Sequence, residues 1–419
     1  MAALGMLEKV LDIYGMIVGT GIGDISIANI KAFGPWPSIG IAVSTIYILI
    51  VTLVIIRLFF LQPNMGSLTA IMRSQMNSRV VSMYTLLTAL TFTCGGLVVA
   101  ANAYKFVESG HRQDQFVMTV VVVCALLMWL VPEALDRFCA WSGGFEITRY
   151  VMIIIGSFVL VGGAQVADTY DPKSSSMMPA TNSTDMLNAI VNVGIFSFAG
   201  FESAAQDVAL RNVILIMATS VMLASATYML TAQASVALVM SSPNIKGPEI
   251  VPLLAEAAST KIMGTDENGL VYWTASVIQV VAVVNGTAGC VRYSTRLMND
   301  TGTAGHLGPL GGLPSALLVL AAAFIFWFTG SHTGLLSIFA AMNTVTHGFS
   351  AYALLCFAYS RNSGWDGMLA CVCLLLVFVV VLAVFIIDDA PGLFALAVAG
   401  GTCLITLLPA GNVPRQHQE

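Results

Sequence analysis

The chain has 419 residues, of which 57% are hydrophobic and only 9% are charged. These are too few charged side chains to coat a water-soluble globule of this length, so the composition excludes a soluble protein and indicates an integral membrane protein. The formal net charge of -5 is small, and no basic run predicts binding to nucleic acid or to an anionic lipid surface.

Apolar stretches of about 20 residues, the length that crosses a bilayer, recur along the whole chain. The N-terminus lacks a basic segment followed by a cleavage site, so we expect the first span to be retained. The twelve predicted spans are 12–33, 38–60, 80–105, 116–132, 149–166, 187–207, 212–240, 271–295, 313–330, 334–357, 367–387 and 391–409.

The distribution of positive charge predicts the orientation of these spans. With a cytoplasmic N-terminus, eleven Lys and Arg residues fall on the inner side and six on the outer side. This excess predicts that both termini are cytoplasmic. The glycosylation sequon at Asn182–Thr184 agrees, because this orientation places it outside. We expect a multi-pass protein of the plasma membrane rather than of an organelle; the sequence does not predict an oligomer or a protein partner.

The histidines and cysteines show no pattern typical of metal binding or catalysis. Eight cysteines lie within or beside apolar stretches and are interpreted as packing residues. Five histidines form no pair at ligand spacing, so we expect no metal and no cofactor. His347 lies inside a predicted span, where we interpret it as a packing residue rather than a proton relay. No nucleophile elbow, zinc motif or phosphate-binding loop is present, so the protein is predicted not to be an enzyme.

The first predicted span contains glycines at every second position, Gly19, Gly21 and Gly23, with Gly15 before them. Each glycine costs about 1 kcal/mol relative to alanine in a helix interior. The stretch therefore predicts a break, which survives at membrane depth only where protein or a polar cavity surrounds it. The alternative is a smooth surface of small residues for close helix packing.

The sixth predicted span is also interrupted near its middle, where small residues around Gly200 precede the carboxylate of Glu202. Spans one and six stand five spans apart, so they would have opposite orientations and matching positions in two inverted halves. Two glycine-interrupted segments in matching positions are typical of a transporter binding site.

Four segments resemble the amino acid–polyamine–organocation (APC) transporters. Gly15–Gly23 and Phe198–Glu202 are similar to their interrupted helices 1 and 6, and Phe60–Ser67 to the inner loop between helices 2 and 3. Tyr293–Leu297, with Thr301–Gly302, resembles the end of their helix 8. The resemblance extends over about residues 8–330.

The resemblance implies an all-α polytopic fold of twelve transmembrane helices. A five-plus-five inverted repeat with discontinuous helices 1 and 6 would be followed by two C-terminal helices. The implied domains are 1–166 for helices 1–5, 167–358 for helices 6–10, and 359–419 for two added helices and a cytoplasmic tail. The implied function is secondary active transport of amino acids or related organocations such as polyamines, by exchange or proton symport. The expected partners are this small-molecule substrate and the lipid bilayer.

Three departures from the family favour a different function. The connection after helix 6 is shortened to Asp207–Asn212, Gly23–Asp24 replaces an aromatic and an apolar residue, and span five contains no lysine. The alternative is a transport-inactive protein of this fold that acts as a sensor or as a subunit of a membrane complex.

A break in each helix would expose backbone groups to a solute. N–H groups near Gly23 or Asp24 would bind a carboxylate at a helix N-terminus, and carbonyls near Ser197–Gly200 and Met16–Val18 would bind an ammonium group. Asp24 has a second interpretation as a helix cap, and the phenylalanines as core residues. The predicted substrate-binding residues are Val18, Gly19, Thr20, Gly21, Gly23, Asp24, Phe196, Ser197, Phe198, Ala199 and Gly200.

Glu202 is the predicted proton-coupling residue, because a carboxyl buried at low dielectric can exchange protons near neutral pH. The alternative is a glutamic acid that only ties helix 6 to its neighbours.

Overall fold

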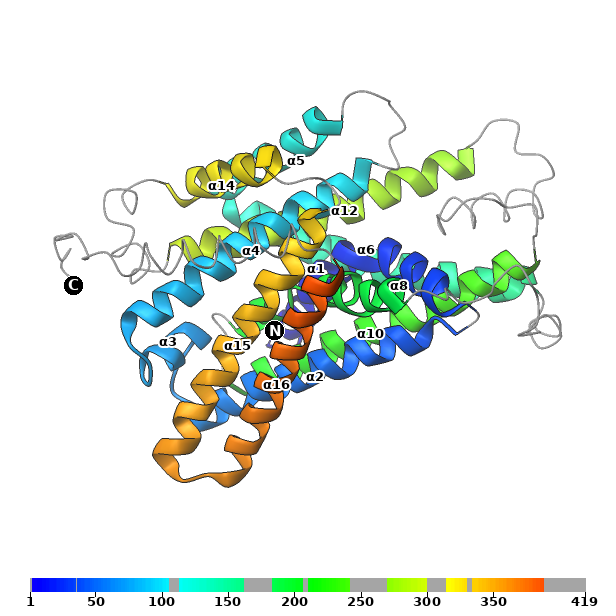
Figure 1. Ribbon diagram of the computed structural model, residues 1–419. Coiled ribbons are helices and arrows are strands. Elements are labelled where there is room, and N and C mark those ends of the chain that lie inside the picture. Colours follow the sequence, from blue (N-terminus) through cyan, green and yellow to red (C-terminus); the bar gives the residue numbers. More distant parts are fainter. Residues whose placement is uncertain are drawn as a thin grey trace.

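The computed structural model describes residues 2–34, 36–104, 113–161, 183–205, 210–241, 270–299, 314–329 and 334–387. Over these ranges the chain forms a bundle of helices (Figure 1). The elements of the first half are α1 (Ala2–Phe33), α2 (Ser38–Leu61), the short α3 (Leu68–Arg73), α4 (Ser78–Tyr104), α5 (Gln113–Leu130) and α6 (Pro132–Val161).

The second half begins with a segmented helix, made of α8 (Ser183–Asn188), the π-helical turn η2 (Ala189–Val193), α9 (Gly194–Ser197) and the 3-10 turn η3 (Phe201–Ala205). The remaining elements are α10 (Leu210–Ser241), α12 (Leu270–Met298), α14 (Ser315–Thr329), α15 (Gly334–Arg361) and α16 (Gly364–Ile387). Helical elements therefore overlap the first eleven predicted spans. The twelfth, 391–409, lies outside the described residues, and the inverted repeat stays a prediction.

Five segments of the described chain are long and apolar enough to cross a membrane. This confirms that the chain is an integral membrane protein. The outer face of α16 fits a lipid environment, since Leu375 and Phe378 are large, apolar and exposed. The five segments are Ser38–Leu61, Ser78–Ala101, Ser183–Ala205, Asn212–Ala234 and Gly364–Ile387.

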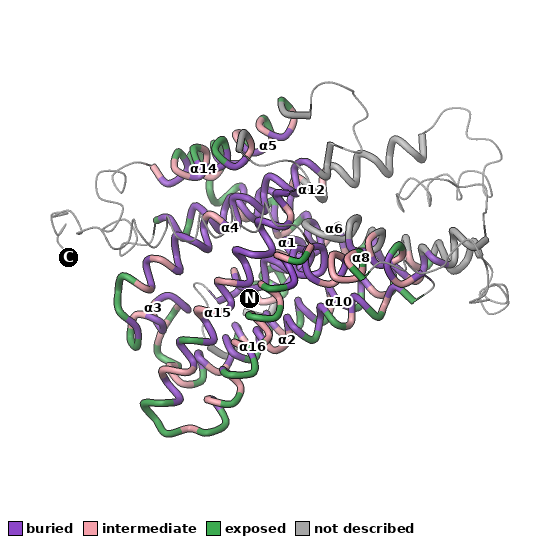
Figure 2. Tube along the Cα trace, viewed as in Figure 1, coloured by how far each residue is buried: buried purple, intermediate pink, exposed green. Residues whose placement is uncertain are grey.

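Helix α1 is the centre of the bundle, where it packs on α6, α10 and α12. Figure 2 shows most of this central region buried, whereas exposed residues follow the outer helices and the turn between α15 and α16. Helices α5 and α14 lie side by side at one edge (Figure 1). The broken helix contacts α1 through α9 and η3, so any site at its interruption borders the central helix.

The predicted break in the first helix is wrong. Helix α1 is continuous from Ala2 to Phe33 and passes through Gly19, Gly21 and Gly23. Each glycine weakens the helix by about 1 kcal/mol, but an unpaired backbone group inside a membrane costs several kcal/mol. The intact helix therefore has the lower free energy unless a partner replaces its backbone hydrogen bonds.

Close packing explains the first glycine of this stretch. A Cβ on Gly15 would lie 2.7 Å from Asn285 Nδ2 and 2.8 Å from the Cα of Gly143. Side chains larger than hydrogen would separate α1 from α12 and α6 at this point. The alternative interpretation, a surface of small residues that lets helices approach, therefore applies at Gly15.

Helix α6 is longer than predicted. It begins at Pro132, two residues after α5 ends at Leu130, so the segment 134–148 is helical instead of a loop. Proline suits the first turn of a helix, where its missing N–H needs no partner. Hydropathy missed this segment because it carries polar side chains, one of which, Glu146, is only 1% exposed.

Ion pairs join helix ends that the charge pattern assigns to one side of the membrane. Arg292 of α12 pairs with Asp12 of α1 and Asp136 of α6, and Arg57 of α2 pairs with Asp366 of α16 at 2.8 Å. These contacts join α12 to α1 and α6, and α2 to α16. The orientation of the helices in the membrane stays a prediction.

Candidate functional site

The predicted interruption of the sixth span is confirmed. Helix α9 ends at Ser197, residues 198–200 form a turn, and η3 begins at Phe201. Gly200 has a φ of +114°, which side chains with a Cβ rarely adopt. Glycine at this position therefore allows the chain to leave the helix in the middle of the segment.

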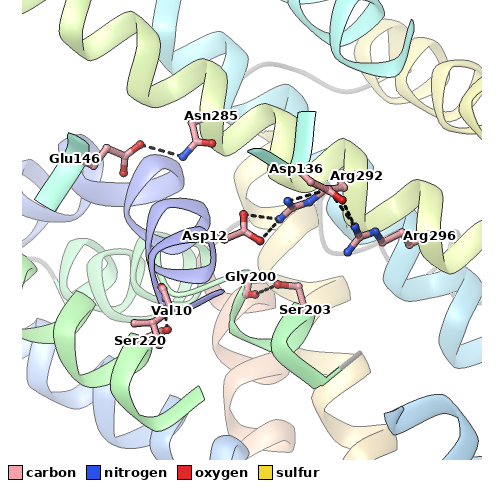
Figure 3. Close-up of polar contacts among 10 residues, drawn as sticks. All are labelled: Val10, Asp12, Asp136, Glu146, Gly200, Ser203, Ser220, Asn285, Arg292 and Arg296. Carbon is pink, nitrogen blue, oxygen red and sulfur yellow. Dashed lines mark hydrogen bonds and ion pairs between the residues drawn. The ribbon is translucent and has the colours of Figure 1, made fainter. Parts of the chain in front are cut away.

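The backbone groups at this interruption are paired by side chains of the chain itself. The Gly200 N–H donates to Glu202 Oε2 at 3.0 Å. The Gly200 carbonyl accepts from the Ser203 hydroxyl at 2.6 Å (Figure 3) and from the Ser203 N–H at 3.1 Å. Of the carbonyls near Ser197–Gly200 that were predicted to bind a solute, that of Gly200 is therefore paired within the chain, and so is the Gly200 N–H.

A tyrosine from α10 joins the interruption to the central helix. The Tyr228 hydroxyl lies 2.5 Å from the Ser197 carbonyl oxygen and 2.8 Å from the Ile17 carbonyl oxygen of α1. The ring is fully buried and meets Phe198 edge to face. One hydroxyl carries one hydrogen, so it donates to one of the two carbonyls at a time. Tyr228 was not predicted as a site residue, because its signal in the sequence is a polar aromatic side chain inside an apolar span.

Replacement of Tyr228 by Phe is expected to lower the free energy of unfolding by about 1–3 kcal/mol, because a buried carbonyl loses its donor while the ring is retained. Unfolding of purified protein in detergent measures this. Tyr14→Phe is the matched control, since it also removes one buried hydroxyl, which bonds Thr227 Oγ1 of α10 at 3.0 Å. A loss for Tyr228→Phe no larger than the control's would contradict the bridging role.

Glu202 is buried, with 4% of its surface exposed, and binds a histidine. His347 Nε2 of α15 lies 2.8 Å from Glu202 Oε1, and His347 Nδ1 lies 3.0 Å from the Tyr47 hydroxyl of α2. A hydrogen-bonded chain thus runs from α2 through α15 to the interruption. The interpretation of His347 as a packing residue misses this pair, because its two partners lie far away in the sequence.

The predicted phenylalanines are core residues. Phe196 meets Phe339 edge to face with ring centroids 5.1 Å apart, and Phe198 meets Tyr228 at 5.2 Å. Ser197 donates to the Val193 carbonyl within its own segment. These contacts support core packing for the aromatic rings. Val18, Gly19 and Ala199 are buried as well.

The remaining predicted residues lie on α1. Thr20, Gly21, Gly23 and Asp24 belong to the continuous helix, and their side chains lie outside the described part. The predicted anion site at a half-helix N-terminus near Asp24 is wrong, since no helix begins there. A cap at Asp24 fails for the same reason.

A second carboxyl lies deep in the bundle. Glu146 of α6 accepts from Asn285 Nδ2 of α12 at 3.3 Å, beside α1 (Figure 3). Both residues are 1% exposed. Asn285 thus makes an interhelical hydrogen bond. Glu146 was not predicted, because its segment was assigned to a loop.

Toward one end of the bundle, Arg292 lies between two carboxylates (Figure 3). Its Nη2 donates to both oxygens of Asp12 at 2.7 Å, and its Nη1 donates to Asp136 at 3.2 Å. Arg296 also binds Asp136, at 2.8 Å. Arg292 is 4% exposed, so its charge depends on these partners for compensation.

No protein-family profile matches the chain, and no curated protein matches it in sequence. Among solved structures, it is similar to the substrate-bound, outward-open state of a Na+-coupled sialic acid symporter. The TM-score is 0.58, with 12% sequence identity over 89% of this chain and 88% of that chain. Two mutants of the Eremococcus coleocola manganese transporter align over 96% of this chain and 92% of theirs, with 15% identity and a TM-score of 0.49.

The likeness to the symporter, at 12% identity, establishes a shared fold. The protein is therefore an integral membrane protein that shares its fold with a membrane transporter. The solutes named for these structures, sialic acid and manganese, are the substrates of those proteins.

Proposed function

We propose that this chain is a secondary active transporter of the APC type, moving amino acids or related organocations across the membrane by alternating access. The observation that carries the proposal is the interruption at residues 198–200, which borders a central helix inside a transporter fold. Discontinuous helices at the centre of a transporter fold are the usual place for its solute.

The charges of the interior favour a cationic solute. Two carboxyls, Glu202 and Glu146, are buried near α1, whereas the buried guanidinium of Arg292 is paired with Asp12 and Asp136. An ammonium group carries three donors. The Ser197 and Ile17 carbonyl oxygens both lie within 2.8 Å of the Tyr228 hydroxyl, which can donate to only one of them at a time. An ammonium group could donate to both carbonyls in place of that hydroxyl. The proposed substrate is therefore an amino acid or polyamine bound through its amino group.

The alternative function, a transport-inactive sensor or subunit of a membrane complex, is favoured by one observation. Helix α1 is continuous, and the polar groups of the interruption already have partners in the chain. A protein that no longer binds a solute would retain such a closed arrangement.

Thermal shift of the purified protein separates the two functions. The proteinogenic amino acids, putrescine and spermidine serve as probes. A ligand at a hundred times its Kd stabilises the folded state by about 2.7 kcal/mol. Stabilisation by one compound class, followed by uptake of that compound into proteoliposomes, supports transport. Stabilisation by none of them, with no uptake, would favour the alternative.

Glu202→Gln is expected to remove the pH dependence of uptake, because the amide cannot take up or release a proton. Uptake into proteoliposomes, measured across a pH series for the compound found above, tests this. Ser203→Ala is the control, since it removes a bond to Gly200 and keeps the carboxyl. Equal and pH-independent uptake by the wild type and Glu202→Gln would exclude a coupling role.

A further inference from the structure

We propose that Glu202 and His347 form one proton-binding site, and that its protonation loosens the interruption at residues 198–200. Tyr47 fixes the tautomer of the histidine. The inference rests on the proposed function and deepens it, because it assigns the coupling proton to a pair of residues. It also says how the proton acts on the proposed substrate site.

Three side chains from three elements form one chain of hydrogen bonds. His347 Nε2 lies 2.8 Å from Glu202 Oε1, and His347 Nδ1 lies 3.0 Å from the Tyr47 hydroxyl. The exposed fractions of Glu202, His347 and Tyr47 are 4%, 1% and 7%. At this burial an uncompensated charge is costly, so each proton in this chain of hydrogen bonds affects the others.

The hydrogen bonds define where the protons sit. When Tyr47 donates to Nδ1, a neutral His347 carries its hydrogen on Nε2 and donates it to the Glu202 carboxylate. The pair then bears one negative charge. A proton from the aqueous phase neutralises it, as imidazolium with carboxylate or as imidazole with carboxylic acid. In the imidazolium form Nδ1 also carries a hydrogen, which the Tyr47 hydroxyl oxygen accepts.

In the part of the chain that the structure describes, no other group around the pair supplies a compensating charge. In the described part of the chain, Glu202 and His347 have no ion pair with a lysine or an arginine. The surrounding titratable side chains are phenols and thiols, which are neutral at physiological pH. They are Tyr84 of α4, Cys290 and Tyr293 of α12, which face Glu202, and Cys373 of α16, which faces Tyr47.

The charge on the Glu202 carboxyl affects the interruption through the second oxygen of that carboxyl. Glu202 Oε2 accepts from the N–H of Gly200, the residue with a φ of +114°. A hydrogen bond to an ionised acceptor is about twice as strong as one between neutral groups. In the carboxylic-acid form of the pair the acceptor is no longer ionised. This form therefore weakens the bond that holds the turn, beside the Ser197 carbonyl where the solute is proposed to bind.

Infrared titration of the purified, full-length protein in detergent tests the shared proton. Acidification is expected to produce a protonated-carboxyl band that Glu202→Gln removes. Its midpoint should shift by about one pH unit or more in His347→Phe, which removes the donor to the carboxylate, and less in His347→Gln. The same midpoint in the wild type and both histidine variants would overturn the pair.

Two further arms apply if the histidine variants do not fold. In the wild type, ring bands of isotope-labelled histidine are expected to change at the midpoint of the carboxyl band. Tyr47→Phe removes the hydrogen bond to His347 Nδ1 that fixes the tautomer, and it is expected to shift that midpoint. Separate midpoints for ring and carboxyl in the wild type would also overturn the proposal.

Hydrogen–deuterium exchange tests the effect on the turn. After correction for intrinsic rates, amides of residues 194–205 are expected to exchange roughly fivefold faster or more when the pair is protonated. Glu202→Gln should show the fast rate at every pH, and Ser203→Ala should retain the pH dependence. A wild-type rate independent of pH would overturn the link. Neither readout uses a solute, so an absence of uptake with both signals present would reject only transport.

Discussion

Replacing Arg292 by Gln is expected to lower the free energy of unfolding by about 2–3 kcal/mol, because a buried guanidinium loses its charge-assisted hydrogen bonds to two partly exposed carboxylates. Arg292 is 4% exposed and compensates two carboxylates at once. Without it, Asp12 and Asp136 lose the buried cation that compensates both, and Asp136 keeps its ion pair with the exposed Arg296. Unfolding of the purified protein, followed by circular dichroism in detergent, measures the loss.

Arg296→Gln is the matched control. Arg296 binds the same aspartate, Asp136, but its side chain is 39% exposed, so its loss is expected to cost no more than about 1 kcal/mol. The double variant Asp12→Asn with Arg292→Gln should regain part of the stability lost by Arg292→Gln, because one unpaired charge is removed. Equal losses for Arg292→Gln and Arg296→Gln would contradict a dependence on burial.

The membrane class and the helix positions follow from local sequence. Apolar stretches located the helices because each must bury or expose a nearly continuous apolar surface in lipid. The same signal failed at 134–148, where α6 carries Glu146 into the interior with Asn285 as its partner. Hydropathy treats such a buried polar pair as two separate reasons for a loop.

Glycine content alone did not distinguish a break from a packing surface. Gly200 lies at a true interruption, where φ is positive and the following Glu202 carboxyl receives the freed N–H. Gly15 lies in an unbroken helix, where the missing side chain admits Asn285 and Gly143. The difference depends on a nearby side chain that can replace a backbone partner. Such a residue lies two positions after Gly200 in the sequence, whereas the neighbours of Gly15 come from distant segments.

The same limit applies to the candidate site. Glu202 was predictable, because an acidic residue inside an apolar span needs a partner. Its partner His347 is 145 residues away, and Tyr228 reaches Ile17 across 211 residues. No spacing rule connects residues at such separations. Only the packing of α2, α10 and α15 around the interruption brings them together.

The contact between α1 and α6 depends on a second glycine, and Gly143→Ala is expected to lower stability by about 3 kcal/mol or more. A Cβ on Gly143 would overlap the carbonyl oxygen of Leu11 and lie 2.7 Å from its carbonyl carbon. Both atoms are backbone of the central helix, so relief requires the whole of α1 to move. Overpacking of a close contact costs about 1–3 kcal/mol where side chains can adjust, and more where they cannot.

The adjacent residue supplies the control for this prediction. A Cβ on Gly144 would meet only Leu11 Cδ1 at 3.5 Å, an ordinary contact. Gly144→Ala is therefore expected to be neutral or to stabilise α6 by up to about 1 kcal/mol through helix propensity. Unfolding and yield of the two variants in detergent give the comparison. Equal stability of both would mean that α1 and α6 do not cross at backbone distance. The central position of α1, on which the borders of the site depend, would then be wrong.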